Sequence, residues 1–455
     1  METWVKAALD YIPRWLDYQM RESEQPGCAV AVAHKGRVVL EQAFGHANAI
    51  KKRPLTPQHR FRVASHSKSF TAAGILRLRE RDKLRLDDPV ARYVDGLHAD
   101  VGAATVGQLL SHSAGLIRDG FDAGQWQDRR PFANAQELRA VLAEPPVLGT
   151  SERFKYSNHG FGLLGLVIES VTGEPYGDWI AREVVARAKL EQTYPDAPPP
   201  KGVPFVSGHS SKLPLGRRVV VPGDNPTQAL APATGFVSTA GDLARFFGSL
   251  DPAARRSPLS PASRREMVRP HWRDNDGSAQ SFYGLGIMCG ELGGWPWFGH
   301  GGAFQSTLSR SIVLPGRDLA VSLLTNAIDG WAPTWSEGVV RILQAFAKHG
   351  APLAKTAKWS GRWWSLWRAL DLVPMRDHVA IANPGLFNPF QEADEIEVSG
   401  RDRGWVRRGG GYTQHGEAVR LTRTKAGRPR ALWVGGVELV TEARMAAEMK
   451  RRYGR

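Results

Sequence analysis

Cysteine is scarce in this sequence, and the scarcity is informative. Of 455 residues only two are cysteine, Cys28 and Cys289, and they lie far apart without a Cys-x-x-Cys spacing. Two isolated thiols provide neither a disulfide framework nor a thiolate metal cluster, so we interpret them as reduced core residues. The thirteen histidines also lack a His-Glu-x-x-His or comparable spacing. The sequence therefore predicts no metal and no cofactor.

Long apolar runs and low-complexity tracts are also missing. No segment approaches the roughly 18 apolar residues that a membrane-spanning helix needs, and the best short run, Phe161–Ile168, contains glycines. Residues Met1–Lys6 include an acidic side chain and lack the apolar stretch and cleavage site of a signal peptide. We therefore predict a protein without a membrane span that is made and kept in the cytoplasm.

Acidic residues are outnumbered by basic ones. The chain has 60 Lys and Arg against 45 Asp and Glu, a net charge of +15. Residues 351–455 alone hold 19 basic and 11 acidic residues, but these are scattered and accompany no zinc-finger, RRM or KH signature. We interpret the excess as a solvated basic surface and predict no dedicated nucleic-acid binding, with polyanion binding as the alternative.

The remaining composition, 42% hydrophobic and 23% charged, is that of a globular protein with enough length for two or three cores. Apolar spacing and turn residues predict the following elements in order: a helix over 4–16, a hairpin turning at Lys35-Gly36, a helix-rich stretch over 106–196, strands over 283–325 and a helix over 335–348. This order indicates a two-lobed α/β (α+β) domain over residues 1–350, with an antiparallel sheet and a helical insert.

The composition changes after residue 350. Residues 351–358 read as a linker, and residues 359–455 as a small β-rich C-terminal domain, a β-sandwich or partial barrel. Six of the fifteen tryptophans fall in this last part. We expect Trp359, Trp363, Trp364 and Trp367 to form its core rather than to cover an active-site mouth.

A hydroxyl and an amine come together at the start of an expected helix, in Ser65-His66-Ser67-Lys68. Residues three apart share a helix face, so Ser65 and Lys68 are expected side by side. A serine hydroxyl is a weak nucleophile, and a desolvated lysine can supply the base that activates it. On its own the pattern also fits an N-cap serine followed by an exposed lysine.

Two further motifs change that interpretation. Tyr156-Ser157-Asn158 precedes an expected helix, and His300-Gly301-Gly302 ends an expected strand. The order Ser-x-x-Lys, Tyr-x-Asn, His-x-Gly resembles the penicillin-recognising serine hydrolases: class C β-lactamases, D,D-carboxypeptidases, esterases and D-aminopeptidases. The resemblance covers nearly all of residues 15–348 and implies a β-lactamase/transpeptidase-like fold. It extends to Phe61–Ser65, Leu109–Leu116 and Thr234–Thr239.

The resemblance implies a role for each residue. Ser65 would be the acyl-accepting nucleophile, Lys68 and Tyr156 the proton-transfer pair, and Asn158 the holder of the substrate amide. The backbone N–H groups of Ser65 and Ala303 would stabilise the oxyanion. Tyr156 can serve as the base only if positive charge favours its phenolate, since a free phenol titrates near pH 10.

The third motif departs from the Lys-Thr-Gly of β-lactamases. A lysine there attracts a substrate carboxylate, whereas a neutral His300 would hold it weakly. Gly301 and Gly302 would let the strand approach the substrate closely.

We therefore predict a serine hydrolase of a small amide or ester, forming an acyl-enzyme on Ser65 and preferring D-amino-acid amides or peptides. The alternatives are a carboxylesterase, a weak β-lactamase or D,D-carboxypeptidase, and a non-catalytic scaffold or binder of peptidoglycan fragments. Assembly into a homo-oligomer is left open.

Overall fold

The computed structural model describes residues 1–274 and 281–454. Its packing divides the chain into two compact units. Unit 1 consists of Met1–Glu24 and Glu337–Arg455, and unit 2 of Gln25–Ser336. The domain borders inferred from the sequence, at residues 350 and 358, stay predictions about which parts fold independently.

Unit 2 is built on an antiparallel sheet of nine described strands. In spatial order they are β3 (Arg53–Pro54), β2 (Arg37–Asn48), β1 (Gly27–His34), β13 (Leu319–Thr325), β12 (Thr307–Leu314), β11 (Trp295–Phe304), β10 (Met288–Leu292), β9 (Ser281–Tyr283) and β8 (Trp272–Arg273). Strand β1 is buried along its whole length. Lys35 and Gly36 both have positive φ, as a two-residue hairpin turn requires. The hairpin expected at these residues is thus confirmed.

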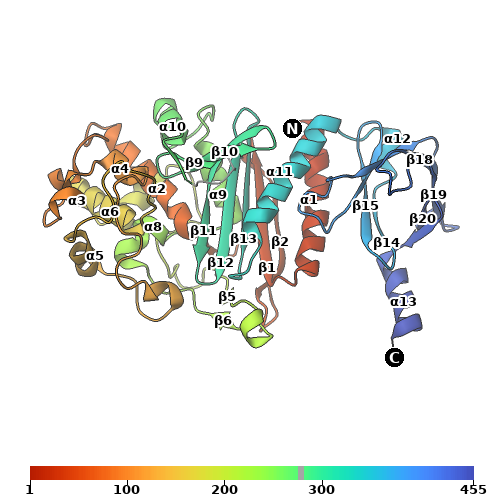
Figure 1. Cartoon of the computed structure of the whole chain (residues 1–455), viewed down its shortest axis with the longest axis horizontal. Helices are drawn as coiled ribbons and strands as arrows, with labels where there is room; N and C mark the ends of the chain where they lie inside the picture. The colour runs from red at the N-terminus through yellow and green to blue at the C-terminus, as the bar shows by residue number, and fades with distance from the viewer. Residues whose placement is uncertain (275–280, 455) are drawn as a thin grey trace. The chain divides into compact units, whose positions relative to one another are not determined.

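Helices make up much of the rest of unit 2. They are α2 (Ser67–Arg79), α3 (Ala99–Ala103), α4 (Val106–Leu110), α5 (Ala135–Leu142), α6 (Asn158–Thr172), α7 (Tyr176–Ile180), α8 (Ala231–Thr234), α9 (Ala240–Ser249) and α10 (Pro261–Val268). Figure 1 shows α2 to α6 and α8 gathered on one side of the sheet. Two short strand pairs join distant segments: β4 (Phe61–Arg62) with β7 (Val237–Ser238), and β5 (Gly208–His209) with β6 (Val220–Val221).

Helix α2 is the centre of the unit 2 core. Most of its side chains are buried, and the ring of Phe70 stacks between Phe236 and Phe246, with centroids 4.2 and 3.8 Å away. Helix α6 packs tightly against α8, where a Cβ at Gly165 would overlap Pro232, and both of these helices contact α2. The core therefore fixes the start of α2, where Ser65 and Lys68 lie.

The ends of α6 follow from local sequence. Ser157 caps its first turn by accepting a hydrogen bond from the N–H of Gly160 at 2.9 Å. Gly173 ends it in the left-handed conformation, with φ 71°. The helix expected over Gly160–Thr172 is confirmed, and its capped start anchors the Tyr156–Asn158 motif.

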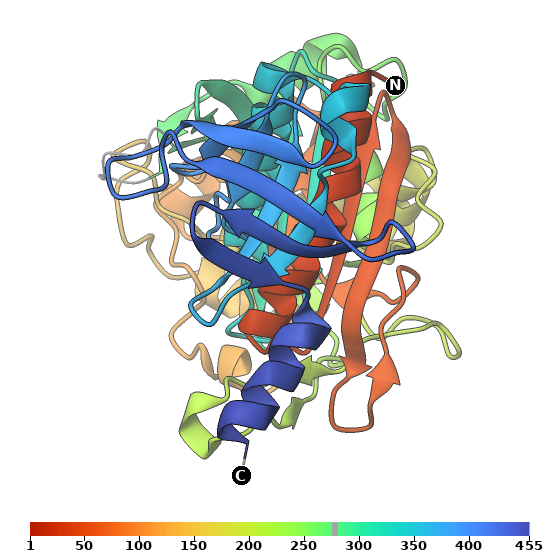
Figure 2. The same ribbon diagram turned by 90° about the vertical axis from the view of Figure 1, so that its right-hand side faces the viewer.

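Unit 1 contains a closed antiparallel barrel. Its strands are β14 (Gly361–Trp364), β15 (Ala369–Pro374), β16 (Val379–Ala382), β17 (Asp394–Val398), β18 (Arg403–Arg408), β19 (Ala418–Arg423), β20 (Pro429–Val434) and β21 (Val437–Val440). The unit also holds α1 (Thr3–Glu22), α12 (Ala354–Ala357), α13 (Glu442–Tyr453) and α11 (Ala332–His349) from Glu337 onward. Figure 2 looks onto the barrel, from which α13 leads to the C-terminus. The small β-rich module expected from the sequence is confirmed.

The barrel interior uses only part of the tryptophan cluster. Trp359 and Trp363 are buried and belong to its apolar core. Trp367 is 93% exposed, because it lies in the turn between β14 and β15. Trp364 is only partly buried and lies outside this core. The expectation that all four tryptophans form the core is therefore wrong for Trp364 and Trp367.

A buried carboxylate ties α1 to the barrel within unit 1. Asp371 is fully buried and accepts hydrogen bonds from Arg362 Nε at 2.8 Å and Nη2 at 2.9 Å. The hydroxyl of Tyr11, on α1, donates to the same carboxylate at 3.0 Å. Two-atom recognition by Arg362 gives a charge-assisted pair that compensates the burial of Asp371.

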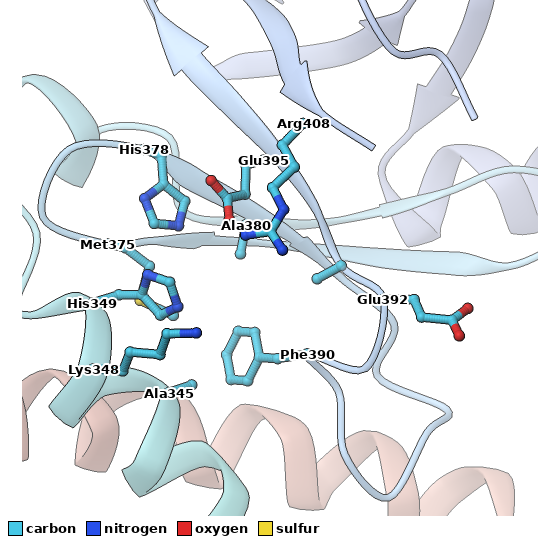
Figure 3. A pocket seen from close by; sticks show the side chains of 11 residues that line it. Ala345, Lys348, His349, Met375, His378, Ala380, Phe390, Glu392, Glu395 and Arg408 are labelled. Atoms are coloured by element: carbon cyan, nitrogen blue, oxygen red, sulfur yellow. Dashed lines mark hydrogen bonds and ion pairs between the residues drawn. The ribbon is translucent and has the colours of Figure 1, made fainter. Parts of the chain in front are cut away.

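Unit 1 also has a cavity of about 180 Å³. Figure 3 shows Lys348 and His349 lining it together with His378, Phe390 and Glu395. None of its lining residues is serine, threonine or cysteine. The cavity therefore offers no hydroxyl or thiol nucleophile of the serine- or cysteine-hydrolase kind.

Among the described residues, no helix combines the length and the apolar character needed to cross a membrane.

Candidate active site

The backbone just before α2 is held in an unusual conformation. Ala64 has φ 47°, in the left-handed region that favours glycine, and Ser65 follows it in a short 3₁₀ turn, Ala64–His66. The Ser67 hydroxyl donates to the Ala64 carbonyl at 2.6 Å and accepts from the N–H of Phe236 at 2.9 Å. These bonds hold the turn and leave Ser65 partly exposed.

The three residues predicted to carry the reaction meet at one point. Tyr156 donates its hydroxyl hydrogen to Ser65 Oγ at 2.8 Å. Lys68 Nζ donates to the same oxygen at 3.3 Å, from one helical turn further along α2. A hydroxyl, an amine and a phenol separated by up to 91 residues in sequence are therefore within hydrogen-bonding distance.

Lys68 is enclosed by acceptors. Its side chain is fully buried, and Nζ donates to Asn158 Oδ1 at 2.6 Å and to the Ala233 carbonyl at 2.8 Å. Burial holds the pKa of Lys68 well below its usual range, a fall that the charge of Asp119 opposes and that of Arg118 reinforces. The neutral amine, which is the basic form, is thus favoured far more than for a lysine in water.

Tyr156 shows the opposite trend. Burial raises the pKa of its phenol, and this outweighs the hydrogen bond to Ser65 and the nearby charge of Arg118, which both lower it. Lys68 Nζ lies 4.7 Å from the centre of the Tyr156 ring. Burial thus favours the protonated form of the Tyr156 phenol and the neutral, basic form of the Lys68 amine.

Asn158 links Lys68 to a carboxylate that the sequence analysis missed. Its amide Nδ2 donates to Asp119 Oδ1 at 2.6 Å, while its Oδ1 faces Lys68. Trp126 Nε1 donates to Asp119 Oδ1 at 2.8 Å. The one available signal was the position of Asp119 just after the segment Leu109–Leu116, which carried the family resemblance.

His300 is a buried, neutral histidine. Its Nδ1 lies 2.6 Å from the Gly301 carbonyl and must donate to it, so Nε2 accepts from the Tyr283 hydroxyl at 2.9 Å. Burial, followed by the neighbouring His66, holds the pKa of His300 well below its usual range. This agrees with the uncharged His300 considered from the sequence.

The glycines after His300 bring β11 against the turn that carries Ser65. A Cβ at Gly302 would overlap the carbonyl oxygen of Val63, so only glycine fits there. Gly301 is partly exposed and Ala303 is exposed, close to the end of the strand. Their contributions to substrate binding stay predictions.

His112 is a second residue that the sequence analysis did not assign. Its Nδ1 accepts from the N–H of Ser157 at 3.1 Å, and its ring centre lies 4.2 Å from that of Tyr156. Burial holds its pKa well below the usual range, and Lys68 and His300 lower it further. His112 therefore supports the Tyr156 ring as an uncharged neighbour.

Comparison with known proteins identifies a family for this chain. A family model described as Beta-lactamase matches residues 12–332, more than two thirds of the chain. The chain belongs to the Beta-lactamase family. The resemblance inferred from the three motifs is thereby confirmed, and proteins of this family and its structural neighbours are usually serine hydrolases.

Curated relatives match one part of the chain. Protein flp of Staphylococcus aureus (strain MW2) is 25% identical over 182 residues, which cover 39% of this chain and 36% of the relative. Penicillin-binding protein 4* of Bacillus subtilis (strain 168) is 32% identical over 176 residues, 38% of each chain. The match thus spans little more than a third of the length of these relatives.

Solved structures match nearly the whole fold. The octameric penicillin-binding protein homologue from Pyrococcus abyssi superposes with a TM-score of 0.66 at 21% identity, covering 95% of this chain and 99% of that one. SurE gives a TM-score of 0.64 at 25% identity, with coverage of 96% and 99%. A D-stereospecific amidohydrolase from Streptomyces sp. gives 0.60 at 25% identity, with coverage of 74% and 97%. The predicted fold class is confirmed.

Proposed function

We propose that the protein is a serine hydrolase that forms an acyl-enzyme on Ser65. The observation that carries the proposal is the pair of hydrogen bonds at Ser65 Oγ, one from a buried amine of lowered pKa and one from a neutral phenol. An amine whose neutral form is favoured by burial can remove the hydroxyl proton as Oγ attacks a carbonyl carbon. Lys68 is then the general base of acylation.

Tyr156 has the complementary role of acid. Its proton passes to the leaving nitrogen or oxygen as the tetrahedral intermediate collapses. The proton that Lys68 took from Ser65 then restores the phenol, so the site begins deacylation with a neutral amine and a neutral phenol. In deacylation a water attacks the ester carbonyl and gives up its proton to this pair, and Ser65 Oγ leaves with a proton returned to it.

The oxyanion of both steps would lie between the backbone N–H groups of Ser65 and Ala303. Preorganised N–H donors stabilise such charge in an acyl-transfer transition state. The close approach of β11 at Gly302 supports this position for the strand. Asn158 retains one amide hydrogen and one lone pair beyond its bonds to Asp119 and Lys68 for contact with a substrate amide.

The substrate that we favour is an amide or short peptide with a D-amino acid on the acyl side. Two neighbours support this preference: one is named a D-stereospecific amidohydrolase, and SurE has also been solved with D-Leu. The buried, neutral His300 replaces the lysine that holds a carboxylate in β-lactamases, which argues against efficient β-lactam hydrolysis. A carboxylesterase is the second candidate, because the Ser65 chemistry serves esters equally well.

The test compares wild type and Ser65→Ala on the p-nitroanilides of D- and L-alanine and on p-nitrophenyl acetate. Ser399→Ala, an exposed serine of the barrel unit, is the control for a neutral serine change. Ser65-dependent cleavage of the D-anilide supports the D-amidase, and Ser65-dependent turnover of the ester alone assigns an esterase. Turnover that survives in Ser65→Ala contradicts the proposal, and a wild type that turns over no acyl substrate favours the scaffold alternative.

Self-association also belongs among the proposals. The homologue from Pyrococcus abyssi is described as octameric, and we propose that this chain too forms a homo-oligomer. Sedimentation equilibrium at several concentrations tests this, and a single species of 50.0 kDa contradicts it.

A further inference from the structure

Asp119 is held more firmly than a loop carboxylate normally is. Two donors, Asn158 Nδ2 at 2.6 Å and Trp126 Nε1 at 2.8 Å, share its Oδ1. Its Oδ2 lies 3.1 Å from Arg118 Nε, and only 13% of the Asp119 side chain is exposed. Charge-assisted bonds of this kind are stronger than those between neutral groups.

This carboxylate dictates the orientation of the Asn158 amide. An ionised carboxylate only accepts hydrogen bonds, so Asn158 must present its NH₂ group to Asp119. Its Oδ1 then faces Lys68 Nζ at 2.6 Å. The reversed amide would place its oxygen against the carboxylate, two acceptors in contact, at a site where Asn158 is only 2% exposed.

The position of Lys68 depends on that orientation. Its Nζ has three acceptors, of which Ser65 Oγ at 3.3 Å is the most distant. Asn158 Oδ1 and the Ala233 carbonyl fix the nitrogen from two other directions. We propose that Asp119 is a positioning residue of the hydrolytic site, which acts through Asn158 to hold Lys68 beside Ser65 and sets the pH range in which Lys68 is a base. This inference rests on the proposed function.

The charges around Lys68 give the direction of the pH effect. Asp119 raises the pKa of Lys68, whereas burial and Arg118 lower it. Tyr156, His112 and His300 also face this site, and burial favours the neutral form of each. Loss of the carboxylate therefore lowers the pKa of Lys68 further, and the neutral amine persists to lower pH.

Asp119→Asn removes the charge and keeps a side chain of the same shape. The test measures the rate of Ser65 acylation by p-nitrophenyl acetate across pH for wild type and this variant. We expect the acid limb of the profile to move to lower pH in Asp119→Asn. Asp119→Ala also releases the Asn158 amide, and we expect a loss of about 100-fold at the plateau, the cost of misplacing a catalytic group by about 1 Å.

The matched control is Asp122→Asn in the same loop. Asp122 accepts from the N–H of Gly124 at 2.8 Å, and its side chain is 67% exposed. We expect its profile to coincide with that of wild type. An acid limb that stays in place in a folded Asp119→Asn variant overturns the inference.

A second readout separates this inference from the proposed function. The ¹³Cε resonance of Lys68 reports its titration directly, without turnover. If wild-type Ser65 is not acylated but the Lys68 titration falls in Asp119→Asn, the proposed hydrolase is wrong and the coupling of Asp119 to Lys68 holds. If Ser65 is acylated and the titration does not move, the hydrolase stands and the role of Asp119 is overturned.

Discussion

Replacing Lys68 with arginine distinguishes two roles for the lysine. Arginine keeps the positive charge but stays protonated at any usable pH. If Lys68 acts as a neutral base, as its burial and lowered pKa indicate, Lys68→Arg abolishes this function. If Lys68 instead acts as a cation that stabilises a Tyr156 phenolate, arginine preserves much of the activity.

The expected loss follows from the usual contribution of general-base catalysis. Such a base accelerates proton transfer about 10²- to 10⁴-fold, which corresponds to about 3–5 kcal/mol of barrier at about 1.36 kcal/mol per factor of ten. We therefore expect kcat/KM for the D-alanine anilide to fall by at least about 100-fold in Lys68→Arg. Lys83→Arg, an exposed lysine just after α2, controls for the substitution itself.

The assay is a pH profile of kcat/KM with thermal unfolding measured in parallel. Since the base form of Lys68 is neutral and its pKa is lowered, the wild-type profile should hold its activity to pH values far below the titration of a free lysine, about 10.4. The smallest loss expected for a general base is about 100-fold. A folded Lys68→Arg variant whose rate falls by less than about 10-fold therefore refutes the role of Lys68 as base.

Three further outcomes are expected. Tyr156→Phe removes the proposed acid. The leaving nitrogen of an anilide needs a proton, so the rate of anilide cleavage should fall much more than the rate of p-nitrophenyl acetate cleavage. Equal losses in the two steady-state rates would argue against Tyr156 as the acid. Gly302→Ala forces a methyl group onto the Val63 carbonyl. It should lower the free energy of unfolding in urea by about 1–3 kcal/mol and also lower the activity. Gly410→Ala, with open space around the glycine, should change neither quantity. Asp371→Ala leaves the mostly buried guanidinium of Arg362 without its carboxylate partner and should destabilise unit 1 by about 3–5 kcal/mol. An unchanged urea midpoint contradicts this.

Much of the fold could be predicted because its signals are local. The first helix, the hairpin at Lys35-Gly36 and the capped helix α6 each follow from periodicity or turn residues within a short window. Closure of the barrel could not, since it depends on Trp364 of β14 pairing with Val440 of β21. Such long-range pairing leaves no mark in either segment alone.

The candidate site likewise has residues that local motifs predict and features that depend on long-range packing. The residues Ser65, Lys68 and Tyr156 were evident from motif order, and the structure brings them together. The sequence analysis could state that Tyr156 acts as a base only if nearby positive charge favours its phenolate. It could not decide whether this holds, because the pKa of Tyr156 depends on burial by segments distant in sequence. Asp119 belongs to no motif, and its one signal is its position just after Leu109–Leu116. Its role could not be predicted from that position, because its contact with Asn158 arises only when two segments 39 residues apart pack together.

The most direct test of the account is to locate the reactive nucleophile by covalent labelling. Wild type and Ser65→Ala would be treated with a fluorophosphonate, and the intact masses and digested peptides measured. We expect wild type to gain one adduct on the peptide that contains Ser65, and Ser65→Ala to gain none. An adduct on another serine, or equal labelling of both proteins, would contradict the assignment of Ser65 as the nucleophile.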